Sequence, residues 1–193
     1  MSSSKKLTVY DIVIVGVMAA IIFALTYFVR LEIPTPAGPT NIKIANAFIL
    51  LAGILFGGLR GGLAGGIGSA IFDLINPLYI SSAPFTLINF FLMGFVCGII
   101  CWIGERRGSH KMLWTVVGSA AGALTYYILY ISKSVLELVL AGSDFWAAVV
   151  GCSTKMVAGG INIVTGVLIA SLLVPVLKTA VTRVGIYQKI HLR

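Results

Sequence analysis

The sequence has 193 residues, of which 59% are hydrophobic and only 10% are charged. Soluble globular proteins carry about 25% charged residues, and a chain of this length cannot bury so much apolar surface in a soluble fold. The sequence therefore predicts an all-α integral membrane protein, because apolar runs of about twenty residues recur and the alternating strands of an outer-membrane barrel are absent. We expect the net charge of +8 to orient the chain in the bilayer, and not to bind nucleic acid.

Six stretches are expected to cross the membrane as helices, within a single domain that covers residues 1–193. The first follows basic residues, as a signal peptide does, but its apolar run is too long for one and no clear cleavage site follows. Proline-containing segments mark the ends of the first and third stretches. The expected spans are residues 9–30, 44–58, 60–77, 84–104, 113–137 and 146–177.

An even number of spans places both termini on the same side of the membrane. The loops on the opposite side carry only Arg30 and Lys43, and two further lysines fall inside spans. The terminal side carries ten basic residues: Lys5, Lys6, Arg60, Arg106, Arg107, Lys111, Lys178, Arg183, Lys189 and Arg193. Because basic residues stay on the cytoplasmic side, both termini are predicted to be cytoplasmic.

The loop LEIPTPAGPTNIK, residues 31–43, contains three prolines. These make it stiff, extended and unsuited to a helix. It is either a plain connector or a structured cap over a ligand. We favour the cap, because prolines reduce the entropy lost when a loop closes.

The stretch GGLRGGLAGGIG, residues 57–68, repeats a glycine pair every four residues. In a membrane helix this spacing lets neighbouring backbones touch, and a dinucleotide-binding reading fails because no βαβ unit surrounds it. Gly16, Ala20 and Ala24 form a second stripe of small residues. At least one of these stripes can face a separate partner protein.

Polar residues line one face of the fifth expected span. Tyr126, Tyr130, Lys133 and Glu137 are spaced by four, seven and eleven residues from the first of them, which is helical spacing. An ionisable side chain costs at least about 2.5–3.5 kcal/mol at the centre of a membrane helix, so it usually faces a partner or a cavity. Lys133 and Glu137 lie near the outer end, so their side chains can alternatively reach the membrane interface.

Lys155 lies nine residues beyond Trp146, which on a continuous helix is about 13 Å and close to the bilayer middle. We favour a cavity in the outer half of the bundle, lined by spans four to six and covered by the proline-rich loop, for a small, flat, polar ligand. A structural polar network, or a lysine acting as a proton or ion relay, is the alternative. The expected ligand-binding residues are Asn41, Lys43, Phe85, Asn89, Tyr126, Tyr130, Lys133, Glu137, Trp146, Lys155 and Asn162.

The sequence carries no pairing of a nucleophile with a base and no metal-ligand cluster, so we do not expect an enzyme. Cys97 and Cys101, four residues apart in an apolar run, are expected to pack in the membrane core. No ATP-binding motif is present, and no cofactor is expected in this chain. The alternatives are a self-sufficient carrier coupled to protons, an intramembrane enzyme and a structural assembly subunit.

The runs IPTPAGPTNIKIANAFILLAGILFGGLRGGLAGGIGSAIFDL, residues 33–74, and APFTLINFFLMGFVCGII, residues 83–100, resemble the substrate-binding S components of energy-coupling factor (ECF) vitamin transporters. The AxxxA pattern of Ala20 and Ala24 is similar to the motif with which S components dock on their coupling subunit. With Gly16, these residues are the expected docking site. The resemblance is closest to the subgroup linked to riboflavin, hydroxymethylpyrimidine and pyridoxine, although related sequences often have an acidic residue where this chain has Asn46.

The resemblance implies a subunit of a prokaryotic plasma-membrane importer. It would capture a vitamin outside, using the first loop and the outer parts of spans four to six. It would then join a transmembrane coupling subunit and two cytoplasmic ATPases, which hold the ATP and Mg²⁺, and release its cargo by toppling in the membrane. The expected substrate is a pyrimidine or pyridine vitamin precursor such as hydroxymethylpyrimidine or pyridoxine, with riboflavin and pantothenate as alternatives.

Overall fold

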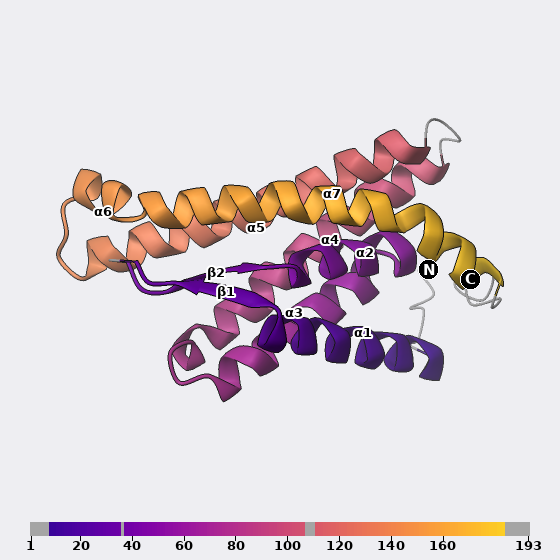
Figure 1. The fold of residues 1–193 in the computed structure, drawn as a ribbon, viewed down its shortest axis with the longest axis horizontal. Coiled ribbons are helices and arrows are strands. Elements are labelled where there is room, and N and C mark those ends of the chain that lie inside the picture. The colour runs from indigo at the N-terminus through magenta and orange to yellow at the C-terminus, as the bar shows by residue number, and fades with distance from the viewer. Residues whose placement is uncertain (1–7, 36, 107–110, 184–193) are drawn as a thin grey trace, which may run out of the picture.

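The computed structural model describes residues 8–35, 37–106 and 111–183. Over these residues the chain is mostly helical, with seven α-helices, one 3-10 helix and one two-stranded hairpin (Figure 1). The elements in chain order are α1 (Val9–Phe28), β1 (Arg30–Ile33), β2 (Thr40–Lys43), α2 (Ala45–Phe56), α3 (Gly58–Ile75), η1 (Ile80–Ser82), α4 (Ala83–Arg106), α5 (Lys111–Leu140), α6 (Phe145–Gly151) and α7 (Ser153–Arg183).

Four helical stretches in the described part of the chain are long and apolar enough to cross a membrane, namely Val9–Phe28, Ile80–Arg106, Met112–Leu140 and Ser153–Arg183. They match the first, fourth, fifth and sixth expected spans. The second expected span becomes α2, which has 12 residues and is therefore about 18 Å long. That is shorter than the hydrocarbon core of about 30 Å. The third becomes the 18-residue α3.

The sixth expected span is two helices. α6 ends at Gly151 and α7 begins at Ser153, with Cys152 between them at φ −86° and ψ 0°. Glycine and serine are weak helix formers, which favours a break here. The continuous helix from which the depth of Lys155 was predicted is therefore wrong, and Lys155 lies in the first turn of α7.

The proline-rich loop is extended, as predicted, but its two arms pair as an antiparallel hairpin. Arg30 lies opposite Lys43, and Ile33 lies opposite Thr40. The turn contains Gly38 at φ +89°, a conformation that glycine adopts without strain.

The glycine repeat allows α3 to pack directly against three other helices. A Cβ added at Gly62 would lie 2.6 Å from the carbonyl oxygen of Phe91 on α4, and one added at Gly68 would lie 2.5 Å from that of Ala19 on α1. A Cβ on Gly61 would overlap the backbone of α2 at Gly53. The packing interpretation of the repeat is thus confirmed.

The stripe of small residues on α1 has a different environment. Ala19 and Ile22 are buried, and Ala19 touches α3. Gly16 and Ala20 are exposed, Ala24 is half-buried, and a Cβ added at Gly16 would meet nothing within 4 Å. This face of α1 is open.

The start of α1 and the end of α7 lie at one end of the bundle, which we call the terminal end, and the strands lie toward the other, the hairpin end (Figure 1). At the terminal end Arg60 contacts Asp11 at 2.7 Å. Of the ten basic residues predicted to lie on the same side as the termini, the structure describes Arg60, Arg106, Lys178 and Arg183. The others, Lys5, Lys6, Arg107, Lys189, Arg193 and the side chain of Lys111, lie outside the described residues.

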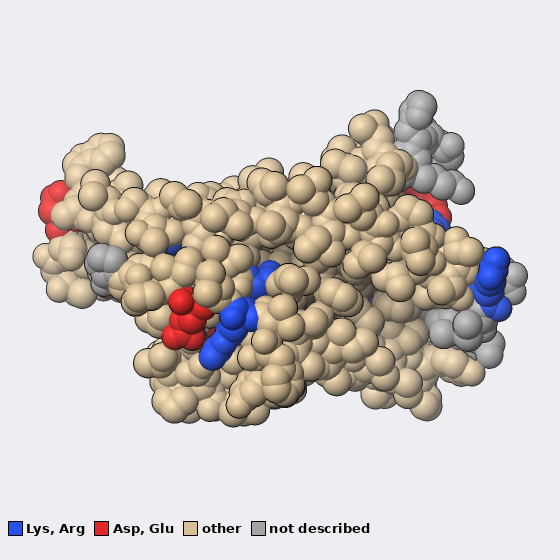
Figure 2. All heavy atoms as spheres, viewed as in Figure 1, with Lys and Arg blue, Asp and Glu red and all other residues tan. Residues whose placement is uncertain are grey.

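Charged side chains are unevenly distributed over the molecule. On the face in view, Figure 2 shows acidic and basic side chains near the hairpin and at the terminal end, acidic ones at the opposite end, and broad uncharged surface between them. Wide uncharged surface suits a protein surrounded by lipid.

Candidate site at the hairpin end

Strand β2 is held against α7 by the side chain of Asn162. The amide oxygen Oδ1 of Asn162 accepts a hydrogen bond from the backbone N–H of Lys43 at 3.0 Å, and its Nδ2 donates to the backbone oxygen of Asn41 at 2.8 Å. Asn162 is 2% exposed. This carboxamide therefore pairs with β2 as a neighbouring strand would, which fixes the hairpin on the bundle.

Two tyrosines hold the same strand from other sides. The Tyr130 hydroxyl on α5 donates to Oγ1 of Thr40 at 2.9 Å, and Asn41 Nδ2 donates to the Tyr79 hydroxyl at 2.9 Å. Tyr79 precedes η1. The hairpin is thus tied to α5, to α7 and to the segment between α3 and α4.

Three stacked rings lie beneath the hairpin. Phe90 and Tyr126 have ring centroids 4.8 Å apart, and Tyr126 and Tyr130 have centroids 5.7 Å apart. The Lys43 ammonium lies over the Phe90 ring at 4.3 Å, and the Lys155 ammonium lies 5.6 Å from the Tyr130 ring. These three rings, which we call the ring stack, therefore have a cation at each end.

Lys155 is buried inside the protein and does not face lipid. It is 5% exposed, and its Nζ donates to Oγ of Ser134 on α5 at 3.2 Å. A Cβ added at Gly38, in the turn of the hairpin, would lie 3.9 Å from this Nζ. The ammonium is enclosed by α5, α7 and the hairpin.

A second charged group lies at the junction of the hairpin, α3, α4 and α5. Asp73 on α3 is 7% exposed, accepts a hydrogen bond from Thr86, and feels the positive charges of Lys43, Lys133 and Arg30. The sequence reading missed Asp73. It offered the same signal as the lysines, since it is an ionisable residue inside an expected span.

Lys133 connects this charged group to α5 and η1. Its Nζ lies 2.8 Å from a carboxylate oxygen of Glu137, 2.9 Å from Oγ of Ser82 and 5.3 Å from the centroid of the Phe85 ring. Glu137 is 54% exposed. This pair therefore belongs to the rim of the site.

Two titratable groups at the hairpin have shifted pKa values, namely Lys43 on β2 and Tyr79, which accepts a hydrogen bond from Asn41. Burial lowers the pKa of Lys43 from 10.5 to about 8, against the opposing pull of Asp73. Burial raises the pKa of Tyr79 to about 12, and the charge of Glu32 adds to this. The Lys43 ammonium is thus held in a setting that favours its neutral form.

Several buried amide atoms have no hydrogen-bond partner among the described residues. Asn46, in the first turn of α2, is 1% exposed, and both its Oδ1 and its Nδ2 are unpartnered. Oδ1 of Asn89 and of Asn41 are also unpartnered. An unpartnered buried amide costs about 1–3 kcal/mol, and native proteins contain few of them.

The structure brings most of the expected ligand-binding residues together. Direct contacts join Asn41 to Asn162, Lys133 to Phe85 and Glu137, and the ring stack to Lys43 and Lys155. Two expected residues are not joined to the others by such contacts among the described residues. Asn89 is 2% exposed with its Oδ1 unpartnered, and Trp146 is 72% exposed on α6 and contacts the neighbouring ring of Phe145. The contacting residues that sequence reasoning missed are Arg30, Thr40, Asp73, Tyr79, Ser82, Thr86, Phe90 and Ser134. It also missed Asn46 as a buried residue with an unpartnered amide.

Within the described ranges, no group of three or more His, Cys, Asp or Glu residues is placed to hold a metal ion. Cys97, Cys101 and Cys152 are buried and free. The chemistry that the hairpin end offers is recognition: stacked rings, two buried ammonium groups and amides with unused hydrogen-bonding capacity.

Comparison with known proteins agrees with this picture. The family model of the ECF-type riboflavin transporter S component matches residues 6–179. A solved structure of the S component of a bacterial ECF transporter has the same fold, with a TM-score of 0.54, 19% sequence identity and coverage of 90% of this chain and 95% of that one. No curated protein matches. The chain belongs to the ECF-type riboflavin transporter S component family.

Proposed function

We propose that this protein binds a flat heteroaromatic vitamin at the hairpin end and hands it to an ECF-type importer. The observation that carries the proposal is the fully buried Asn46, whose amide is unpartnered. It lies three residues after Lys43, whose ammonium covers one end of the ring stack. A purely structural network would satisfy such an amide internally. A ligand with both hydrogen-bond donors and acceptors would satisfy it on binding.

Riboflavin is our first candidate substrate, because the matching family is described by that vitamin. Its fused ring presents a wide face to aromatic side chains, and its ring carbonyls accept hydrogen bonds of the kind that Lys43 and Lys155 donate. Hydroxymethylpyrimidine and pyridoxine share a flat ring with polar edges and are the second candidates.

Entry of the substrate requires the hairpin to move, because it closes directly on the ring stack. Four side-chain hydrogen bonds hold β2: two from Asn162, one from Tyr130 and one to Tyr79. Each contributes about 0.5–1.5 kcal/mol, so the hairpin can open at a moderate cost while the helices stay packed.

The chain supplies binding, and partners would supply the energy. We infer that it joins a transmembrane coupling subunit and two ATPases in the plasma membrane, with its terminal end toward the cytoplasm. The open face of α1 at Gly16 and Ala20 would dock on the coupling subunit, because small residues let two membrane helices approach closely.

Replacement Ala20→Trp should reduce complex formation and leave vitamin binding by the isolated chain unchanged. Unaltered complex formation would exclude this face.

Substrate binding is tested with the purified chain alone. Riboflavin binding is followed by quenching of flavin fluorescence, and the other vitamins by thermal shift. We expect tight binding of one vitamin without ATP, and weaker binding by Lys155→Met. Lys178→Met is the matched control, because this lysine pairs with Glu105 at the terminal end. Uptake into liposomes by this chain alone, driven by a pH gradient, would instead establish a secondary carrier.

A further inference from the structure

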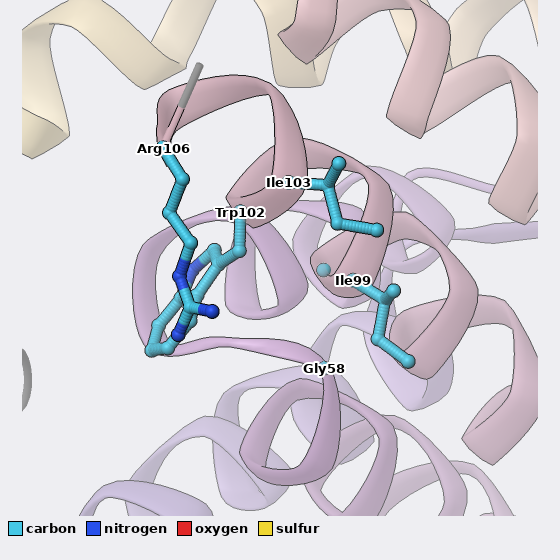
Figure 3. Close-up of a pocket in the computed structure, with 6 residues that line it drawn as sticks. Gly58, Ile99, Trp102, Ile103 and Arg106 are labelled. Atoms are coloured by element: carbon cyan, nitrogen blue, oxygen red, sulfur yellow. The ribbon is translucent and has the colours of Figure 1, made fainter. Parts of the chain in front are cut away.

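A cavity of about 200 Å³ lies at the terminal end, away from the proposed vitamin site. It is lined by Gly58 at the start of α3 and by Gly98, Ile99, Trp102, Ile103 and Arg106 of α4, and we call it the α4 notch. Figure 3 shows the Trp102 and Arg106 side chains at one side of it, with Ile99 and Ile103 following along the helix.

The position of the notch along α4 corresponds to the depth expected for lipid headgroups. Arg106 is the last residue of the candidate span Ile80–Arg106, so its guanidinium is expected where hydrocarbon gives way to phosphate. Ile103 is 45% exposed and lies about one turn deeper along the helix, and Ile99 is 39% exposed and lies about two turns deeper. The notch thus has an apolar inner part and a cationic outer part.

The charge at this end also favours an anionic ligand. The Asp11 carboxylate contacts Arg60 at 2.7 Å, and the Glu105 carboxylate contacts Lys178 at 2.6 Å. Among the described residues, no ion pair joins Arg106 to a carboxylate. Arg106 is also exposed, so its planar group of five donors is available for a phosphate.

We propose that the α4 notch binds one anionic phospholipid. Arg106 binds the phosphate, one acyl chain lies along Ile99 and Ile103, and the Trp102 indole lies between them at the level of the glycerol. The ammonium of a zwitterionic headgroup would lie beside the guanidinium and repel it, so a lipid with net negative charge is preferred.

The test uses Trp102 as a local reporter in the full-length chain. Trp114→Phe and Trp146→Phe leave Trp102 as the single tryptophan, and the protein is reconstituted in phosphatidylcholine vesicles with a small share of brominated phosphatidylglycerol or brominated phosphatidylcholine. Bromine quenches indole fluorescence on contact. We expect phosphatidylglycerol to occupy the notch with about fivefold preference, the effect of one basic residue near an anionic surface.

Two arginine variants separate the notch from general surface charge. Arg106→Gln should abolish the preference, whereas Arg183→Gln, which removes an exposed arginine in the last turn of α7, should leave it intact. Equal quenching by both lipids would overturn the proposal, and so would an equal loss of the preference for phosphatidylglycerol in both arginine variants. Competition by inorganic phosphate would overturn it as well, since the occupant would then be a free anion. If the reporter variant does not fold, native mass spectrometry compares the phosphatidylglycerol retained by Arg106→Gln with that retained by the unchanged protein. Less lipid on Arg106→Gln is expected, and equal amounts would overturn the proposal.

Discussion

The Asn162 side chain binds the backbone of Lys43 at 3.0 Å, although 119 residues separate them in the chain. Its other amide atom binds the backbone of Asn41. One carboxamide on α7 thus fixes two positions of the strand that covers the ring stack.

Replacement Asn162→Leu should loosen the hairpin and weaken vitamin binding. Leucine has a similar size and makes neither hydrogen bond, so the expected loss is about 1–3 kcal/mol, or about 5–150-fold in Kd. Amide hydrogen exchange at Asn41 and Lys43 should become faster. Thr165→Val serves as the control, because the Thr165 hydroxyl binds its own helix at Ile161. Unchanged exchange at the strand in Asn162→Leu would contradict this account of the hairpin.

Replacement Asn46→Leu should change stability and binding in opposite directions. Removing an unpartnered buried amide should raise the free energy of unfolding of the empty protein by about 1–3 kcal/mol. The same change should weaken vitamin binding, because the ligand loses its partners. Both are measured on one preparation, by thermal unfolding and by titration.

Ser171→Ala is the matched control for Asn46→Leu. The Ser171 hydroxyl is also buried without a partner among the described residues, but it lies on α7 nine residues beyond Asn162, toward the terminal end. Its removal should leave vitamin binding unchanged. If Asn46→Leu lowers stability and leaves binding intact, the Asn46 amide is structural and the proposed site is wrong.

Lys43 should make stability rise with pH in an alkaline window. Its pKa is about 8 in the folded protein and 10.5 when solvated, so between these values the unfolded chain binds more protons. Stability therefore increases as pH rises from about 8 to 10.5. Lys43→Met should remove this part of the rise, as measured by chemical unfolding at several pH values, and Lys178→Met should keep it. Identical pH profiles for Lys43→Met and the unchanged protein would contradict the burial of this ammonium.

Replacement Gly62→Ala should destabilise the bundle, because the added methyl would lie 2.6 Å from the Phe91 carbonyl oxygen. Forcing a methyl into such a contact costs about 1–3 kcal/mol. Gly160→Ala is the control, because a Cβ at Gly160 would meet nothing within 4 Å and alanine favours a helix by up to about 1 kcal/mol. A lower midpoint of thermal unfolding is expected for Gly62→Ala alone. Equal midpoints would show that α3 and α4 have room to separate.

The features that could be predicted from the sequence follow a helical period. Glycines spaced by four predict close packing, and Tyr126 and Tyr130, also spaced by four, stack at 5.7 Å. Lys133 and Glu137 form an ion pair on the same face. In the tyrosine pair and the ion pair both partners belong to one helix, so spacing alone brings them together. The glycine repeat predicts close packing, but not which helices pack on it.

The features that could not be predicted depend on contacts between elements that are distant in the sequence, or on small differences in local helix propensity. Phe90 and Asn46 look ordinary within apolar runs, and only the packing of α2, α4 and α5 shows their positions. The break at Cys152 lies between Gly151 and Ser153, whose low helix propensities amount to about 1 kcal/mol or less each, so the sequence did not distinguish it from a continuous helix. The two arms of the proline-rich loop pair across a turn, and the prolines suggested stiffness without suggesting that pairing.

The short helix α6 carries two aromatic rings that other described residues leave largely uncovered, since Phe145 is 55% and Trp146 is 72% exposed. A tryptophan ring, which is amphipathic, partitions into the layer between water and hydrocarbon. α6 would therefore anchor the hairpin end at the membrane interface. A rotation of the whole bundle that carried this end through the bilayer would have to remove α6 from the interface, at a cost in free energy. That cost would favour the return of the emptied protein to its starting orientation.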